Sequence, residues 1–79
     1  MDGRLKLNVA ILKTLRRGKG LSQEAMARDC FTRGYTVSIA TLKRAESGKF
    51  VLYRTANNIA RYYNIALPEL MELADQSTG

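Results

Sequence analysis

Two segments decide the fold of this chain: Leu21-Ser22-Gln23-Glu24-Ala25-Met26-Ala27 and, after nine residues, Val37-Ser38-Ile39-Ala40-Thr41-Leu42-Lys43-Arg44-Ala45-Glu46-Ser47-Gly48. In each segment a serine stands directly before a helical run, where its hydroxyl can cap the first turn. Gly48 suits the position just beyond a helix C-terminus. The segments therefore predict two consecutive helices, the second over about 38–47.

Three further helices are expected around this pair. The first covers about 7–17, with Ile11, Leu12 and Leu15 at helical spacing and Gly18 and Gly20 behind it. The fourth begins near 53–55 and ends at Asn64, and we expect Tyr63 rather than Tyr62 to face inward, in phase with Ile59. The fifth opens at Pro68 and carries Leu70, Met71 and Leu73. No segment predicts a strand. The pattern indicates a single, compact, all-α, five-helix domain with its core over about 7–73.

The charge of the chain is unevenly distributed. The net charge is +6, and all 13 Lys and Arg residues precede residue 67, whereas Glu69, Glu72 and Asp75 lie beyond it. A basic body fits a polyanion-binding surface, although an ordinary solvated basic surface fits it equally well. The chain has no histidine, and its one cysteine is Cys30. We therefore expect no metal, no cofactor and no disulfide. Because no apolar run is long enough for a membrane span or a signal peptide, we expect a cytoplasmic protein.

The helix over about 38–47 has two distinct sides. At 100° per residue, Leu42 and Ala45 lie together and should face the core. The opposite side carries Ala40, Lys43, Arg44 and Ser47, with Ile39 and Thr41 on the flanks. Small residues let a helix approach base edges, and long cations one turn later can reach a guanine or a phosphate. A plain solvated face is the alternative for this helix taken alone.

In their order and spacing, these motifs resemble the Cro/CI-type helix-turn-helix family, the lambda-repressor-like or Xre domains. That family shows Leu-Ser-Gln-Glu at the second helix and Val-Ser-x-x-Thr-Ile-Ser-x-x-Glu-x-Gly through the recognition helix. The second pattern is met at Val37, Ser38, Thr41, Glu46 and Gly48, with Leu42 and Lys43 replacing the Ile and Ser. Leu15-Arg16, Ile59-Ala60 and the segment 65–70 also match. The resemblance implies sequence-specific binding of duplex DNA by a transcriptional regulator, with a homodimer on two half-sites as the expected geometry.

The resemblance also implies roles for individual residues. Base edges would be contacted by Ile39, Ala40, Thr41 and Arg44, although Ile39 fits a packing role equally well. Phosphates would be contacted by Ser22, Gln23, Ser38, Lys43, Lys49, Tyr53 and Arg54. Capping alone is a sufficient role for the two serines, and packing is an alternative role for Tyr53. Arg16 and Glu46 would form a structural salt bridge between the first helix and the recognition helix.

One departure from the family lies between Ala27 and Val37. Nine residues separate them, whereas a tight helix-turn-helix turn uses about four. Either the second helix is longer or the turn is a real loop. The insert Arg28–Thr36 contains Phe31, which we expect to pack, and Tyr35, for which packing and DNA contact stay open.

Other functional classes fit the sequence less well. Without histidine, a metal-ligand cluster or paired carboxylates, an enzyme is not expected. The main alternative is an antitoxin-type or other protein-interaction module on the same scaffold. Met71 is then the residue of the fifth helix that we single out for a contact with a second chain. An RNA binder would be expected to carry an aromatic stacking surface, and six aromatic residues are few. Both a complete protein and the N-terminal part of a longer regulator, with a C-terminal domain or protein partner, fit the chain.

Overall fold

Directly before the first helix, the backbone of residues 7 and 8 pairs with that of residues 70 and 71. The computed structural model describes residues 3–71, in which α1 spans Val9–Gly18. Leu7, where we expected this helix to start, forms an antiparallel bridge with Met71, and Asn8 N donates to Leu70 O over 2.6 Å. The Asn8 side chain then caps the helix by accepting from Ile11 N. Backbone pairing at residues 7 and 8 thus delays α1 to Val9.

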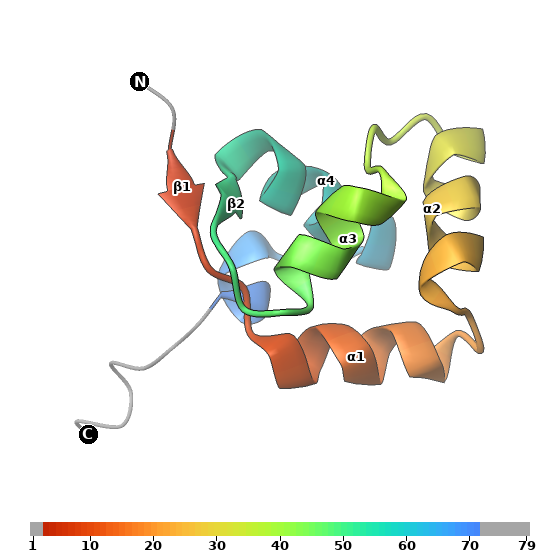
Figure 1. Ribbon diagram of the computed structural model, residues 1–79, viewed down its shortest axis with the longest axis horizontal. Coiled ribbons are helices and arrows are strands. Elements are labelled where there is room, and N and C mark those ends of the chain that lie inside the picture. Colours follow the sequence, from red (N-terminus) through yellow and green to blue (C-terminus); the bar gives the residue numbers. More distant parts are fainter. Residues whose placement is uncertain (1–2, 72–79) are drawn as a thin grey trace.

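The helix α2 spans Gln23–Thr32 and α3 spans Ile39–Ala45. Ser22 accepts a hydrogen bond from Ala25 N, and Ser38 accepts one from Thr41 N, so both predicted serine caps are confirmed. α3 ends two residues earlier than expected, because residues 46–48 turn away and Gly48 adopts a φ of 79°. That left-handed conformation is readily available only to glycine. Figure 1 shows α2 and α3 at a steep angle, with a loop between them.

A small sheet, which the sequence did not predict, joins the N-terminus to the segment after α3. The strand β1 (Arg4–Leu5) pairs antiparallel with β2 (Val51–Leu52), and Arg4 lies opposite Leu52. Tyr53 N extends the pairing by donating to Gly3 O over 2.8 Å. Two-residue strands are too short for an alternating pattern to show in the sequence. The expectation of no strand was therefore wrong.

The C-terminal part consists of α4 (Tyr53–Tyr63) and a short 3₁₀ helix, η1 (Leu67–Leu70). Asn64 ends α4, as predicted, and adopts a left-handed φ of 60°. The expected fifth α-helix was wrong, because the described residues contain four α-helices and this single 3₁₀ turn. Met71 is extended where it pairs with Leu7, so η1 cannot continue through it. Leu73, which we placed on that helix, lies outside the described residues.

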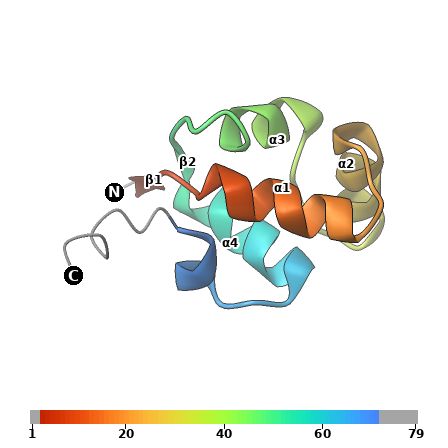
Figure 2. The ribbon, with the colours of Figure 1, turned by 90° about the horizontal axis from the view of Figure 1, so that it is seen from below.

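The core lies between α1, α2, α3 and α4. Its largest fully buried side chains are Leu7, Leu12, Met26, Cys30, Leu42, Ile59 and Leu70. Burial raises the pKa of the Cys30 thiol to about 11, so this side chain remains a neutral thiol and acts as a small apolar group. Figure 2 shows α1 running between α3 on one side and η1 on the other.

The burial of the two adjacent tyrosines of α4 is the reverse of the prediction. Tyr62 is buried, at 6% exposure, and Tyr63 is half-buried. The Tyr62 hydroxyl donates to Asp29 Oδ2 on α2, and the Tyr63 hydroxyl contacts Met26 Sδ. Tyr62 can be buried because Asp29 satisfies its hydroxyl. Mainly through this hydrogen bond, the pKa of Asp29 is lowered.

An ion pair between Arg16 and Glu46 joins α1 to the C-terminal end of α3. The Arg16 guanidinium donates to both carboxylate oxygens, with Nε–Oε2 at 2.8 Å and Nη2–Oε1 at 2.9 Å. Gln23 Nε2, at the start of α2, donates to Oε1 over 3.0 Å. The Glu46 side chain is only 2% exposed. Burial alone would raise its pKa, but the hydrogen bonds from Arg16 and Gln23 and the nearby positive charges outweigh burial and lower it.

The substitution Glu46→Gln tests this pair. Above its unfolded-state pKa near 4.5, the Glu46 carboxylate stabilises the fold fully, and this contribution is lost as the pH falls through the lower folded-state pKa. We expect the variant to lose about 1–3 kcal/mol of unfolding free energy at pH 7, with the difference from wild type shrinking below about pH 4.5. Urea unfolding at a series of pH values measures this difference.

Glu24→Gln is the matched control, because Glu24 is exposed and forms no ion pair within the described residues. It should leave the unfolding free energy nearly unchanged at each pH. A Glu46→Gln difference that stays constant down to pH 3 would show that the carboxylate charge does not stabilise the fold.

Candidate nucleic-acid interface

One side of α3 is turned away from the protein. Leu42 and Ala45 are buried, at 1% and 0% exposure, as the helical spacing predicted. The opposite side, formed by Ala40, Lys43, Arg44 and Ser47, is exposed. We call these four residues the outer face of α3. They combine two small side chains, Ala40 and Ser47, with two long cations, and no acid lies among them.

The flanks of this outer face are half-buried. Ile39 and Thr41 lie at the start of α3, where Ser38 Oγ accepts from Thr41 N over 3.1 Å and donates to Thr41 Oγ1 over 2.9 Å. Ser38 therefore has the capping role that we considered sufficient for it. Its position at the helix start also places it beside any ligand that approaches Ile39 or Ala40.

Residues after α3 add further cations. Lys49, Tyr53 and Arg54 are all exposed, and Tyr53 is 55% exposed at the first position of α4. The packing role that we considered for the Tyr53 side chain is thus limited, although its backbone N–H holds Gly3. Lys49 N donates to Arg44 O and so keeps this segment close to the end of α3.

Side chains at the start of α2 are less available for a DNA contact than the sequence suggested. Ser22 is exposed and caps Ala25 N, while the Gln23 side chain is directed toward Glu46. An amide nitrogen carries two hydrogens, so one N–H of Gln23 is still available after this hydrogen bond. Gln23 therefore combines a structural contact with a position in the first turn of a helix, where backbone N–H groups attract anions.

Arg44 is not directed straight outward. Its Nη2 donates to Phe50 O over 3.1 Å, on the connection between α3 and β2. The same side chain lines a polar cavity of about 300 Å³ together with Arg4, Thr41, Phe50, Val51, Leu52 and Thr55. No sequence pattern indicated Arg4, because only the pairing of β1 with β2 brings residue 4 to this cavity.

The insert Arg28–Thr36, which the Cro/CI-type pattern lacks, forms both a longer α2 and a real loop. α2 continues to Thr32, and the chain then turns at Gly34, which has a φ of 88°. Tyr35 N donates to Cys30 O over 2.8 Å. The Tyr35 ring packs edge-on against Tyr62, with centroids 6.3 Å apart. Tyr35 is half-buried and therefore has a packing role.

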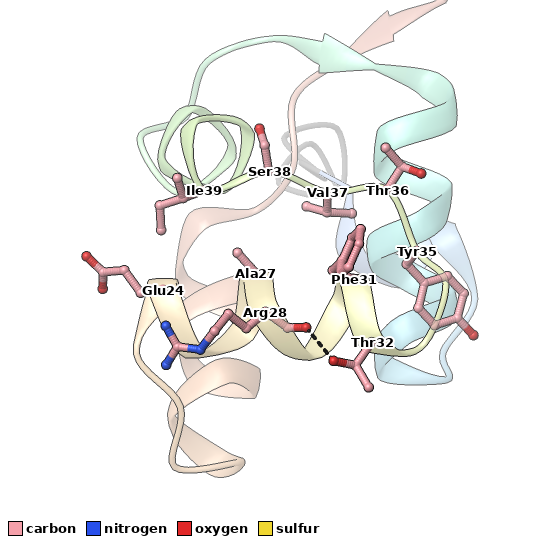
Figure 3. Close-up of a pocket in the computed structure, with 10 residues that line it drawn as sticks. All are labelled: Glu24, Ala27, Arg28, Phe31, Thr32, Tyr35, Thr36, Val37, Ser38 and Ile39. Atoms are coloured by element: carbon pink, nitrogen blue, oxygen red, sulfur yellow. Dashed lines mark hydrogen bonds between the residues drawn. The ribbon is translucent and has the colours of Figure 1, made fainter.

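A mostly apolar groove of about 590 Å³ lies between α2 and α3. Its walls are formed by Glu24, Ala27, Arg28, Phe31, Thr32, Tyr35, Thr36, Val37, Ser38 and Ile39. Figure 3 shows the loop arching over one end of the groove and Ile39 at the other end. Phe31, which we expected to pack, is 83% exposed, so that expectation was wrong. Along α2 the core is filled by Met26 and Cys30, and Phe31, the next residue after Cys30, lies about 100° further around the helix, toward the solvent.

The part of the chain that the structure describes contains no group of three or more side chains that could hold a metal ion. None of the helices over residues 3–71 is both long and apolar enough to cross a membrane. Comparisons with protein-family models, curated proteins and solved structures gave no match to this chain. The resemblance to the Cro/CI-type family therefore depends on the motifs quoted above.

Replacement of Phe31 tests whether it contributes to the fold. We expect Phe31→Ser to change the unfolding free energy by no more than about 0.5 kcal/mol, because the side chain is mostly in water. Met26→Ala, in the buried part of the same helix, should cost about 2–5 kcal/mol. Thermal unfolding followed by circular dichroism compares the two variants. A loss from Phe31→Ser as large as that from Met26→Ala would show that Phe31 packs in solution.

Proposed function

We propose that this protein binds duplex DNA sequence-specifically through α3 and thereby regulates transcription. The observation that carries the proposal is the outer face of α3, which presents Ala40 beside Lys43 and Arg44 while Leu42 and Ala45 attach the helix to the core. A helix that reads base edges must be attached to the core on one side and exposed on the other.

The dimensions of α3 fit a major groove. The groove is about 12 Å wide and admits one α-helix with its side chains. Ala40 allows close approach, and Ile39 and Thr41 on its flanks can contact thymine methyl groups or base edges. The exposed Lys43, one turn later, can reach a phosphate at the groove wall.

Backbone contacts would surround this helix. Ser22 and Gln23 offer the first turn of α2 to a phosphate, and Ser38 offers the first turn of α3. Lys49, Tyr53 and Arg54 follow α3 and are exposed. The described residues hold 13 Lys and Arg against four acids, of which Asp29 and Glu46 are already paired with arginines. Such a balance favours association with a polyanion.

A second candidate is a protein-interaction module of the antitoxin type. The apolar groove between α2 and α3, with Phe31 exposed beside it, favours this candidate. The two functions are compatible on one domain. Phe31→Ser should leave duplex binding intact if only the second function uses the groove.

Selection of bound sequences from a random duplex pool, at two salt concentrations, tests the proposed function. We expect an enriched sequence motif, and a homodimer would show two half-sites whose centres lie about 34–36 Å apart along the duplex. Binding that falls with salt but enriches no motif would contradict sequence-specific recognition.

The substitution Ala40→Glu tests the role of the outer face. A carboxylate at this position would meet base edges and phosphates, and we expect affinity for the selected duplex to fall by at least about tenfold. Ala66→Glu is the matched control, because Ala66 is also exposed but directly precedes η1. η1 lies on the other side of α1 from α3 (Figure 2). Fluorescence anisotropy measures both affinities. Equal affinities of the two variants would exclude α3 as the reading helix.

A further inference from the structure

The polar cavity beside α3 gathers positive charge from three parts of the chain. Arg4 comes from β1, Arg44 and Thr41 from α3, and Thr55 from α4. The lining thus includes two arginines and two threonines. No carboxylate of residues 3–71 lines it. We call it the Arg4–Arg44 cavity.

The fold fixes the backbone of Arg4 and the side chain of Arg44. Arg4 lies opposite Leu52 in the antiparallel pairing, which places its Cα within a regular backbone ladder. The Arg44 guanidinium donates from Nη2 to Phe50 O, so one of its five N–H groups is used and the others are available for a ligand. A guanidinium held in this way loses less side-chain entropy when it binds a ligand.

None of the four acids within residues 3–71 lines this cavity. Glu46 is engaged with Arg16 and Gln23, and Asp29 is engaged with Arg33 and Tyr62. Glu24 lines the separate groove between α2 and α3. Two arginines that line one cavity without a neighbouring acid in its lining make it attractive to an anion. Guanidinium forks match the oxygens of a phosphate group, and threonine hydroxyls can donate to the same oxygens.

We propose that the Arg4–Arg44 cavity is an anion site that holds one phosphodiester group of the bound duplex. This inference rests on the proposed function, because the duplex supplies the phosphate. When a helix lies in the major groove, the phosphates of the two strands flank it. The cavity lies at the flank of α3, between that helix and β2. Arg44 is thereby assigned to the DNA backbone, in place of the base edge that the sequence suggests, and Arg4 becomes its partner.

A double-mutant cycle on the selected duplex tests this assignment. We expect Arg4→Ala and Arg44→Ala each to weaken binding about tenfold, and to weaken it alike for matched and mismatched sequences. Because both arginines hold one phosphate, the double variant should lose much less than a hundredfold. The slope of log affinity against log salt should fall by about one in the double variant. Arg61→Ala, an exposed arginine on α4 that does not line the cavity, is the control and should change affinity by less than about twofold.

Two results would overturn the inference. Fully additive losses, with a salt slope reduced by about two, would show that the arginines contact separate phosphates. A relaxed base preference in Arg44→Ala would return Arg44 to a base edge. Circular dichroism of each variant establishes that it is folded before its affinity is interpreted.

A second measurement keeps this inference separate from the proposed function. The free protein is titrated with inorganic phosphate, and the side-chain N–H signals of Arg4, Arg44 and Arg61 are followed by NMR. Saturable shifts confined to Arg4 and Arg44 support the anion site. If the same shifts are seen in a wild-type protein that binds no duplex, the ligand of the site is free phosphate and the proposed function alone fails. Equal shifts at all three arginines, or none, would mean that the cavity is not a phosphate site.

Discussion

The arrangement of the first three helices depends on the Glu46 carboxylate, which is buried at the C-terminal end of α3. Arg16 from the last turn of α1 binds both of its oxygens, and Gln23 from the first turn of α2 binds one of them. Arg16 Nη1 also donates to Leu21 O, between α1 and α2. A buried charge is tolerated only when its partners are in place, so the helices cannot shift independently without leaving that charge uncompensated. This constraint holds α3 with Leu42 and Ala45 inward and its outer face toward the solvent.

The longer connection between α2 and α3 has its own contacts and leaves the ion pair around Glu46 intact. α2 extends to Thr32, and the loop returns through Tyr35, whose ring packs on Tyr62. Arg33 pairs with Asp29, which also accepts the Tyr62 hydroxyl, so the loop is tied to α4 as well as to α2. The ion pair around Glu46 and the packing around Tyr62 lie at opposite ends of α2. Between α2 and α3 the longer connection leaves the apolar groove beside Phe31.

The proposed interface has two parts with different chemistry. The outer face of α3 offers a small residue for close approach to base edges, and the Arg4–Arg44 cavity offers two arginines for a phosphate. If both are used, the sheet has a functional role as well as a structural one, because β1 carries Arg4 to the flank of the reading helix. A backbone contact next to the reading helix would fix its depth and register in the groove.

The sequence by itself determined the features that depend on neighbours within about one helical turn. The caps at Ser22 and Ser38, the end of α4 at Asn64 and the inward direction of Leu42 and Ala45 all follow from local hydrogen bonds and helical spacing. Arg16 and Glu46 were paired through the family resemblance, because a contact between residues thirty positions apart leaves no local pattern. Only the tertiary structure decided that residues 4–5 pair with 51–52, that Tyr62 is buried, that Phe31 is exposed and that Arg4 lies beside Arg44. Each of these outcomes depends on which distant group is within reach to fill a hydrogen bond or occupy the core, and helical spacing contains no information about distant groups.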